Sequence, residues 1–537
     1  MRFWRHVKVG SATLLVVALL VLEGCVDEVE VGNRNVIFIV VDTLRADALS
    51  ISGGGVRTPN LDHLARLGAR FERSYSHVPV TGPSHASMFT GLLPSEHGVV
   101  VNADPLPDKL TTLAEILRDR SYSTAAIVSL GVLQGKYGFD QGFDEFDERF
   151  GENYFRSGDE ITEAALEWLA AAPRSPFFLW LHYSDPHEPY SPPTESFPLA
   201  EVWLNSRYLQ TISADGYRQI IELDLESGDN TLLFASPRGE IEPQGELQFR
   251  QMRLWSESVS MVSPDGWLED TASTNKKRIV RLEGLSALPT ALTLTNPSPL
   301  PQRVRLTFLL HEPYTPERAR ELYGAETVFL DHQIGNLLAS LERLHLLEDS
   351  ILVLTSDHGE GLGEHDLVGH IQQVYDSLLR VPLLMAAPGL IPNDITVNTT
   401  VRHIDVLPTL LHWLQIEIPS GLSGVSLAPL MSGQRPGTPL PVHSGTYRPL
   451  AKFDQQSLVR FPYKYILNLQ TSKEELYHLE LDPGEVNDLM HQSPEIAAKL
   501  RLEMESRAHS ASPDETKDAT ELSQEELDKL RALGYIN

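Results

Sequence analysis

The segment NVIFIVVDTLRAD (residues 35–47) carries the clearest structural signal in the chain. Residues 36–41 form a continuous apolar run that ends at Asp42, which is typical of a central strand buried on both faces of a parallel sheet. The same analysis predicts further strands and helices, with strands at 124–130, 177–181 and 350–355 and helices at 60–68, 109–118, 160–172 and 317–344. Strands that alternate with helices predict an α/β domain with a largely parallel sheet.

Polar residues follow the carboxyl ends of these strands. Asp42 follows the first strand, Asp357 and His358 follow the strand at 350–355, and His358, His365 and His370 fall within thirteen residues. A single Asp after a strand is commonly a helix N-cap. Two carboxylates with an imidazole at the ligand-binding edge of an α/β sheet instead favour a divalent metal ion.

A second polar segment is TGPSHAS (81–87). Gly-Pro followed by small hydroxyl residues predicts a tight turn that enters a helix, with Thr81 near the helix N-terminus. Backbone N–H groups and the helix dipole favour an anion there. On its own, Thr81 is equally compatible with a capping residue.

The stretch 197–310 has a different pattern. Its short runs are rich in Val, Ile, Leu and Thr, are separated by Gly, Pro, Asn and Asp, and lie at 217–225, 230–236, 246–255, 278–285, 290–296 and 303–310. No helical period is visible, so an antiparallel β-sandwich inserted into the α/β domain is predicted. The tetrapeptide HEPY occurs at 187–190 and again at 311–314, one copy on each side of this stretch.

The predicted organisation therefore has six parts. They are a signal segment (1–24), the α/β domain in two parts (33–196 and 311–435), the inserted β-sandwich (197–310), a C-terminal α+β subdomain (436–507), and a polar linker with a terminal amphipathic helix (508–537).

Composition excludes several classes of function. The chain has 537 residues, with 44 Lys and Arg against 73 Asp and Glu, a formal charge of −29. Nucleic-acid binding needs a basic surface, so no nucleic-acid partner is expected. The single cysteine, Cys25, argues against an intramolecular disulfide and any Cys-ligated zinc site.

The N-terminus has the pattern of an export signal. Arg2, Arg5 and Lys8 precede an apolar stretch at 9–22, which is too short for an ordinary membrane span and is followed by Glu23, Gly24 and Cys25. This resembles a bacterial lipoprotein signal. It implies an exported protein in the periplasm or at the cell surface, anchored to a membrane by a lipid on Cys25. The alternatives are a signal peptide with an incidental cysteine and an uncleaved anchor.

Several ordered motifs resemble the sulfatase family of the alkaline phosphatase superfamily. They cover nearly all of the chain outside the signal and the insert, and they lie at 35–47, 58–71, 81–98, 177–190, 322–338, 355–370, 378–389, 403–411 and 463–489. The resemblance implies an alkaline-phosphatase-like α/β sandwich around a central, largely parallel sheet. It also implies a hydrolase that acts on ester bonds.

The resemblance assigns one divalent metal ion to Asp42, Asp357 and His358, with Thr81 as a further ligand. Thr81 stands where sulfatases carry the cysteine or serine that becomes formylglycine, and so matches the nucleophile. The resemblance thus implies both a metal ion and a covalent intermediate.

Three histidines stand at family positions around the ester, and a fourth is an alternative for one of them. His187 matches a histidine near the leaving-group oxygen, and His182, expected on the same turn, is the alternative for that role. His370 stands where sulfatases have an anion-binding lysine, and His85 stands where an arginine supports formylglycine. We therefore expect His187 or His182 in catalysis and His370 and His85 in substrate binding.

Departures from the sulfatase pattern change the expected chemistry. Thr81 cannot become formylglycine, because oxidation of its secondary alcohol gives a ketone. Thr43 replaces the second aspartate of the calcium site, His358 replaces an asparagine, and Ser129 stands near the position of a sulfate-binding lysine. These changes favour an unmodified Thr81 nucleophile and Mn²⁺ or Zn²⁺ rather than Ca²⁺.

The same departures resemble other members of the superfamily. Asp42, Thr81, Asp357 and His358 are similar to the set in lipoteichoic acid synthases and phosphoethanolamine transferases. Nucleotide pyrophosphatases hold a second metal ion, for which only Asp185 and His187 are partial candidates here, so one metal ion is expected.

Three functions remain open from the sequence. The first, which we favour, is hydrolysis of a sulfate or phosphate ester that is small or linked to a glycan or lipid. The second is an envelope phosphoryl-group transferase, although such enzymes usually have several membrane spans. The third is a non-catalytic binding lipoprotein whose site has decayed.

Overall fold

The central sheet is built around β1 (Asn35–Val41), which pairs in parallel with β17 (Ser350–Ser356) on one side and β6 (Phe177–Tyr183) on the other. Val36, Phe38 and Val40 of β1 belong to one hydrophobic core, and the alternate residues belong to a second core. Side chains alternate across a strand, so β1 is buried on both faces, as its apolar run predicts.

The sheet has eight strands in the order β22-β2-β21-β17-β1-β6-β4-β5. The strands not yet described are β2 (Ala69–Phe71), β4 (Ser123–Ile127), β5 (Glu145–Asp147), β21 (Leu383–Ala386) and β22 (Ile395–Val397). All pairings are parallel except those of β21 with β17 and β2. The predicted α/β fold with a largely parallel sheet is therefore confirmed.

This computed structural model describes residues 33–508 with short gaps, which lie at 151–154, 172, 189, 191, 193–197, 214–218, 236–246, 257, 263–267, 275–276, 287–289, 312–314, 371–372, 435–438 and 447–453. The expected signal segment, Cys25 and the terminal helix at 521–535 lie outside the described residues. Among the described helices, none is both long and apolar enough to cross a membrane.

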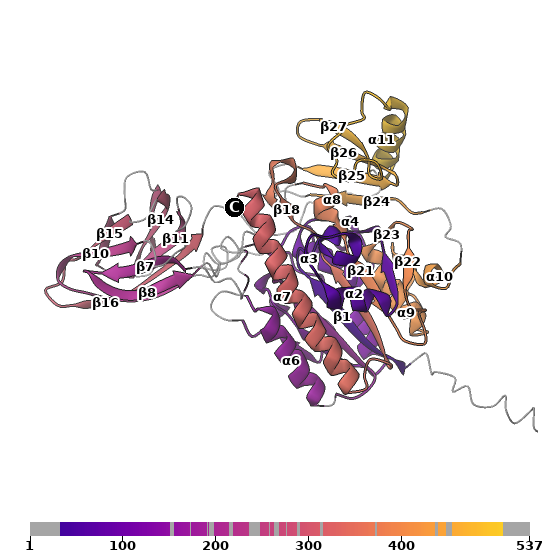
Figure 1. Cartoon of the computed structure of the whole chain (residues 1–537), viewed down its shortest axis with the longest axis horizontal. Helices are drawn as coiled ribbons and strands as arrows, with labels where there is room; N and C mark the ends of the chain where they lie inside the picture. Colours follow the sequence, from indigo (N-terminus) through magenta and orange to yellow (C-terminus); the bar gives the residue numbers. More distant parts are fainter. Residues whose placement is uncertain are drawn as a thin grey trace, which may run out of the picture.

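Helices cover both faces of the sheet (Figure 1). One layer contains α2 (Pro59–Arg66), α6 (Gly158–Ala170) and α7 (Pro316–Arg343), and the opposite layer contains α3 (Thr81–Thr90), α5 (Leu113–Arg118) and α9 (Val406–Trp413). Each layer buries its apolar residues in a different core: Leu61, Ile161 and Leu330 in one, Met88, Leu117 and Leu410 in the other.

The helix predicted at 109–118 begins later, at Leu113. Thr112 forms a capping box: its hydroxyl accepts from the Glu115 N–H at 3.2 Å, and the Glu115 carboxylate accepts from the Thr112 N–H at 2.9 Å. Satisfying these terminal N–H groups sets the first helical residue.

Residues 198–311 contain two five-stranded sheets, with orders β12-β15-β10-β7-β8 and β13-β14-β11-β16-β9. The strands are β7 (Pro198–Leu204), β8 (Arg207–Ser213), β9 (Gln219–Leu225), β10 (Gly228–Ala235), β11 (Leu247–Ser256), β12 (Ser260–Val262), β13 (Leu268–Thr274), β14 (Lys277–Ser286), β15 (Thr290–Asn296) and β16 (Gln302–His311). They lie to one side of α7 (Figure 1) and fall in the stretch where the sequence predicts an inserted β-sandwich.

The two sheets share their own hydrophobic core, separate from those of the α/β domain. At its centre the rings of Phe234, Phe249 and Phe308 contact one another, with ring centroids 5.0–6.3 Å apart. The β7–β8 hairpin was not predicted. Its turn residues Asn205 and Ser206 both have left-handed backbone angles, φ 49° and 67°, as a tight two-residue hairpin turn requires. The domain boundaries themselves stay a prediction.

The C-terminal region contains a four-stranded antiparallel sheet covered by a helix. Its elements are β24 (Val442–Gly445), β25 (Gln455–Arg460), β26 (Tyr463–Asn468), β27 (Glu474–His478) and α11 (Pro494–Ala508). Leu458, Tyr465 and Leu476 of the sheet share a core with Leu500 and Met504 of α11.

Small elements complete the fold near the carboxyl edge of the central sheet. They are β3 (Ser74–Tyr75), β18 (Gly361–Leu362), β19 (Val368–Gly369), β20 (Arg380–Val381), β23 (Val401–Arg402), α4 (Pro94–His97), α8 (Asp376–Leu379) and α10 (Ala428–Met431).

Candidate metal centre and active site

The register of the central strands brings the predicted metal ligands together. Val41 of β1 lies opposite Ser356 of β17, so the next residues, Asp42 and Asp357, leave the sheet side by side. Both strands are parallel and end at the same edge, which is where α/β sheets bind ligands.

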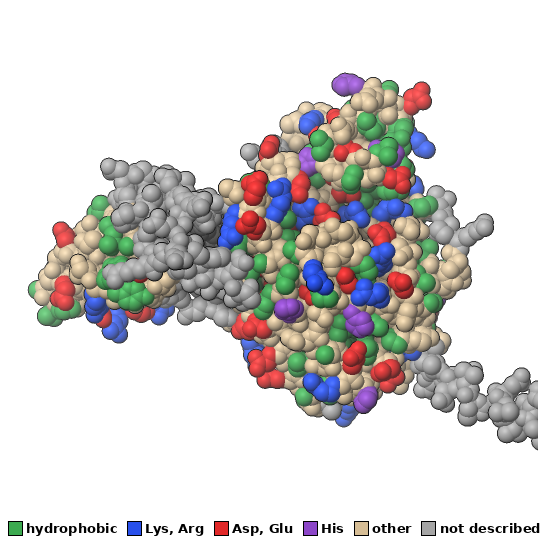
Figure 2. Space-filling view, in the orientation of Figure 1, with side chains coloured by type: hydrophobic (Ala, Val, Ile, Leu, Met, Phe, Trp, Pro, Cys, Tyr) green, Lys and Arg blue, Asp and Glu red, His purple; other side chains and the backbone are tan. Residues whose placement is uncertain are grey.

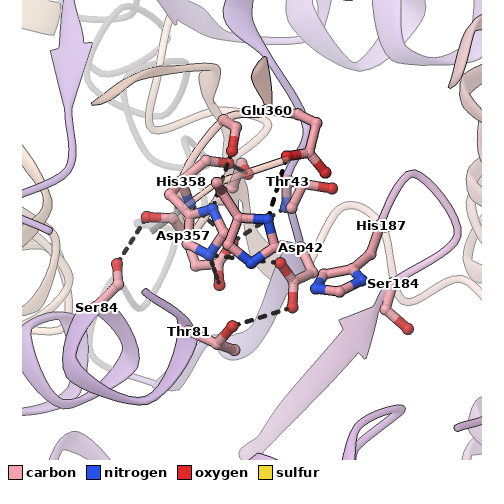
Figure 3. A network of polar contacts seen from close by, with 12 residues as sticks. Asp42, Thr43, Thr81, Ser84, Ser184, His187, Asp357, His358 and Glu360 are labelled. Atoms are coloured by element: carbon pink, nitrogen blue, oxygen red, sulfur yellow. Dashed lines mark hydrogen bonds and ion pairs between the residues drawn. The ribbon is translucent and has the colours of Figure 1, made fainter. Parts of the chain in front are cut away.

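Asp42, Asp357 and His358 form the one cluster of metal-type ligands found among the described residues (Figure 3). His358 Nε2 lies 3.7 Å from Asp42 Oδ1 and 3.5 Å from Asp357 Oδ2. All three side chains are fully buried, and these three atoms make no hydrogen bond. Burial raises the pKa of Asp42 well above its usual range, and the negative charges of Asp357 and Glu360 raise it further.

This donor set fits a divalent cation. Two buried carboxylates that face each other repel unless a positive charge compensates them. Orphaned carboxylate oxygens and a neutral imidazole nitrogen in one cluster supply the donors that such an ion needs. Asp42, Asp357 and His358 would hold it.

Thr81 is the first residue of α3 and is fully buried. Its hydroxyl donates a hydrogen bond to Asp42 Oδ2 at 3.4 Å. The start of α3 is tied to the ligand loop, because the Ser84 hydroxyl donates to the backbone oxygen of Asp357 at 2.7 Å. The Gly82 N–H also donates to Asn102 Oδ1 at 2.8 Å. The structure thus brings the candidate nucleophile to the metal-type cluster (Figure 3).

Thr43 adopts a left-handed backbone conformation, φ 58°, which is unusual for a β-branched residue and costs about 1–3 kcal/mol. Its neighbours hold it there: the Thr43 N–H donates to Asp357 Oδ1 at 3.2 Å, and the Tyr323 hydroxyl donates to the Thr43 carbonyl at 3.0 Å. The backbone at this position, where sulfatases have a second aspartate, therefore orients Asp357.

The prediction that His182 and His187 share one turn is wrong. His182 lies inside β6, and its Nε2 is 4.0 Å from Asp42 Oδ2. His187 lies in the following loop, where its ring is 4.9 Å from the ring of His370. The two histidines therefore belong to different sides of the site, because a residue within β6 is held by the sheet register.

On the side of Thr81, His85 and His182 have ring centroids 5.0 Å apart. His182 Nδ1 lies 2.7 Å from the Ser129 hydroxyl, which donates to the Ser184 hydroxyl at 2.8 Å. His85 Nδ1 lies 2.8 Å from the Thr81 carbonyl and 3.9 Å from Asp357 Oδ2. Burial lowers the pKa of both imidazoles, so both are neutral near pH 7.

On the other side, His370 lies between His187 and the metal-type cluster, with its ring 4.6 Å from that of His358. Burial lowers the pKa of His370 to about 4. Burial also lowers the pKa of His187 well below its usual range, with His370 and His358 as further causes.

Glu360 belongs to this side and was not predicted. Its carboxylate lies 3.1 Å from His370 Nδ1, and burial raises its pKa to about 8. Arg45 Nη1 donates to the Glu360 backbone oxygen at 3.0 Å. A second acidic residue two positions after His358 in the segment SDHGEG was the available signal.

Two residues that the sequence analysis considered lie outside the cluster. His365 stacks on Tyr375, with ring centroids 3.5 Å apart and an interplanar angle of 4°. Asp185 accepts a hydrogen bond from the Gly158 N–H at 2.8 Å, at the start of α6. The Asp185 carboxylate therefore pairs with a backbone N–H in the first turn of α6. The structure gives no support to its assignment as a ligand of a second metal ion.

Comparison with known proteins shows the family to which the chain is similar. The sequence model of the Sulfatase family matches residues 34–416, and that of the C-terminal region of N-sulphoglucosamine sulphohydrolase matches residues 363–510. An N-acetylglucosamine-6-O-sulfatase of Bacteroides thetaiotaomicron is 26% identical over 517 residues, which cover 89% of this chain and 87% of the relative.

Solved structures share the fold. A protein in complex with its substrate D-glucosamine-2-N,6-O-disulfate has a TM-score of 0.61 at 19% identity and covers 90% of this chain and 100% of its own. The phosphonate monoester hydrolase of Agrobacterium radiobacter has a TM-score of 0.60 at 18% identity and covers 89% of this chain and 96% of its own.

The family match covers most of the chain, and the metal-type ligands meet at the carboxyl edge of the sheet, where α/β folds in general bind ligands. The chain belongs to the sulfatase family, and it is a hydrolase that acts on ester bonds.

Proposed function

We propose that the protein is a metal-dependent hydrolase of sulfate or phosphate esters that uses unmodified Thr81 as its nucleophile. The observation that supports this most directly is the hydrogen bond from the Thr81 hydroxyl to Asp42 Oδ2 at 3.4 Å, within a buried cluster of metal-type ligands. A threonine cannot become formylglycine, so the mechanism of a formylglycine sulfatase is closed to this chain.

The metal ion that we propose is Mn²⁺ or Zn²⁺. The cluster offers one imidazole nitrogen beside two carboxylates, whereas Ca²⁺ prefers an all-oxygen shell. Bound by Asp42, Asp357 and His358, such an ion polarises an ester oxygen and lowers the pKa of a nearby hydroxyl. One transition-metal ion per chain is the expected elemental analysis, and stoichiometric calcium would contradict the assignment.

Thr81 would attack the phosphorus or sulfur atom in line with the leaving alcohol. One bond forms from Thr81 Oγ1 to that atom, and the bond to the ester oxygen breaks. Asp42 Oδ2 accepts the Thr81 hydrogen bond and is therefore the nearest acceptor for its proton. Water would then release the transferred group from Thr81.

His187 would give a proton to the leaving alcohol, and His370 would orient the transferred group. Their rings lie 4.9 Å apart, and the ring of His370 lies 4.6 Å from that of His358. A bound anionic ester favours the protonated form of a neighbouring imidazole, which opposes the lowering of the His187 pKa by burial. His85 and His182 lie beside Thr81 and Asp42, so we assign them to the nucleophile side rather than to the leaving group.

The family match favours sulfate esters, whereas Thr81 and the structural likeness to a phosphonate monoester hydrolase favour phosphoesters. A panel of p-nitrophenyl sulfate, p-nitrophenyl phosphate, bis(p-nitrophenyl) phosphate and p-nitrophenyl phenylphosphonate separates these classes.

The mechanism is tested on that panel with variants of α3. Thr81→Ala should abolish turnover without unfolding the protein, and Thr81→Ser should keep part of it, because the reaction needs a hydroxyl and not the methyl group. Thr90→Ala is the matched control, since Thr90 lies in the same helix and its hydroxyl donates only to the Ala86 carbonyl at 2.6 Å. Undiminished activity of Thr81→Ala would end the proposal.

We also propose that the protein is exported and held in the periplasm or at the cell surface by a lipid on Cys25. The support is the basic and apolar signal pattern that precedes this single cysteine. Cys25→Ser should move the protein from the membrane fraction to the soluble fraction. Equal membrane association of the variant would leave an uncleaved anchor as the explanation.

A further inference from the structure

The two outer faces of the β-sandwich differ in chemistry. On the sheet that contains β9 and β16, exposed ion pairs join the strands: Arg303 to Asp224 and Arg305 to Glu222, each at 2.8 Å. Such pairs are typical of a solvated face. Figure 2 shows charged side chains along one edge of this lobe and hydrophobic side chains over another part.

The opposite outer face, on β8, β7, β10 and β15, carries an apolar row that crosses four strands. Tyr208 lies opposite Trp203, Trp203 opposite Leu233, and Leu233 opposite Ala291. The neighbours Val202, Leu232 and Leu292 belong to the internal core, so by alternation the row points outward. Tyr208 is 47% exposed, and its ring lies 5.3 Å from that of Trp203.

Hydroxyl groups flank the apolar row on both sides. They belong to Thr211, Thr231, Thr293, Thr295 and Ser260, which are exposed or half-buried. The ionisable side chains among these outward positions are carboxylates: Glu201 lies opposite Thr211, and Asp229 accepts from the Thr295 hydroxyl at 2.7 Å.

This composition distinguishes between ligands. Trp and Tyr are also enriched among the key residues of protein interfaces, so the aromatic pair alone fits either ligand, whereas Thr and Ser are under-represented there. Two aromatic rings flanked by hydroxyl and carboxylate groups are better suited to a sugar than to a protein partner. The apolar C–H face of a sugar packs on an aromatic ring, and its hydroxyls donate to carboxylates and exchange hydrogen bonds with threonine.

Charge selects the kind of sugar. Glu201 and Asp229 repel sulfate or uronate groups, and the whole chain has a formal charge of −29. We propose that the outer face of β8, β7, β10 and β15 is a binding site for an uncharged stretch of polysaccharide. The row spans three strand spacings, about 14 Å, which matches a short run of sugar rings. The site is distinct from the ester-cleaving centre, and it does not depend on the mechanism proposed for that centre.

Affinity electrophoresis of the full chain tests the proposal. Native gels would contain hydroxyethyl cellulose, xylan, mixed-linkage β-glucan, galactomannan or dextran, and mobility would be compared with a polymer-free gel. Wild type should be retarded by at least one polymer, and Trp203→Ala with Tyr208→Ala should remove that retardation. Arg303→Ala with Arg305→Ala, on the opposite face, is the matched control and should keep it.

Three outcomes would overturn the proposal. They are free migration of wild type in every gel, equal retardation of the aromatic double variant, and retardation by dextran sulfate alone. The single variant Tyr208→Ala removes an exposed ring and spares the core, so it should lower the affinity at least threefold even if the double variant does not fold. Sedimentation velocity adds one check: a wild-type dimer that dissociates in Tyr208→Ala would identify the face as a contact between two copies.

Discussion

The metal-type cluster and the outer face of the β-sandwich use polar residues in opposite ways. Asp42, Asp357 and His358 are fully buried, so each unpaired donor or acceptor carries a large desolvation cost that a bound ion or a proton must offset. Tyr208 and Trp203 stand on the surface, where their polar atoms already have partners: Trp203 Nε1 donates to Glu201, and the Tyr208 hydroxyl lies 2.9 Å from that of Thr211. We therefore expect single changes at the cluster to have large effects and single changes on the sandwich face to have small ones.

The largest effect is expected at the cluster. Asp42→Asn removes one of two facing carboxylates, so it should abolish metal binding and lower turnover on the order of 10³-fold or more. Metal ions should stabilise wild type by about 4 kcal/mol at a thousandfold excess over Kd, and the variant not at all. Elemental analysis and thermal unfolding with and without a chelator measure this. A variant that keeps its metal ion would contradict the assignment of Asp42.

The core of the sandwich comes next. Phe234→Ala removes a buried ring that contacts Phe249 and Phe308, which should cost about 3–5 kcal/mol. Because the sandwich has a separate core, the loss should appear as an early unfolding transition while metal binding persists. Calorimetry of metal-loaded protein resolves the two transitions. A single transition that shifts as a whole would show that the two regions unfold together.

Asp185 provides a pH-dependent contrast inside the α/β domain. Burial raises its pKa from 3.8 to about 7, so the folded state binds this proton more tightly than the unfolded state. The resulting stability is complete below about pH 4 and is lost as pH rises through 7. Asp185→Asn keeps an acceptor for the Gly158 N–H, so the difference in stability between pH 5 and pH 8 should shrink by about 3 kcal/mol at most. Unfolding by denaturant at both pH values is the measurement, and an unchanged difference would mean that Asp185 ionises freely.

The smallest effect is expected on the charged face of the sandwich. Arg305→Ala breaks an ion pair with Glu222 in which both side chains are about half exposed, so stability should change by about 0.5 kcal/mol or less. Chemical denaturation in low and high salt measures this. A loss above about 1 kcal/mol would show that the pair contributes more than an ordinary surface contact.

The sequence predicted the elements that depend on local pattern. The bounds of β1 and α7 were predicted to within one or two residues. A strand that is buried on both faces has a continuous apolar run, whereas a helix that is buried on one side has apolar residues every three or four positions. The β7–β8 hairpin was missed, since its turn at Asn205 and Ser206 lacks the glycine that usually marks such a turn.

The candidate site divides in the same way. Asp42, Asp357 and His358 could be predicted because they follow the ends of strands, and Thr81 because it matches the position of the sulfatase nucleophile. Glu360 was missed and His365 was given too much weight, although both lie in the same short segment. Their positions depend on how the loop turns, which follows from contacts with Arg45 and Tyr375 that are remote in sequence.

By itself, the sequence determined the α/β fold, the position of Asp42 and Asp357 directly after strands, and the chemical fact that Thr81 cannot be oxidised to formylglycine. These features follow from the spacing of apolar residues along the chain and from the covalent chemistry of single side chains, neither of which depends on contacts between distant segments. Only the tertiary structure decided that His182 faces Asp42 while His187 faces His370, and that Asp185 caps α6. Strand register and packing between distant segments set these contacts, and no local pattern encodes them.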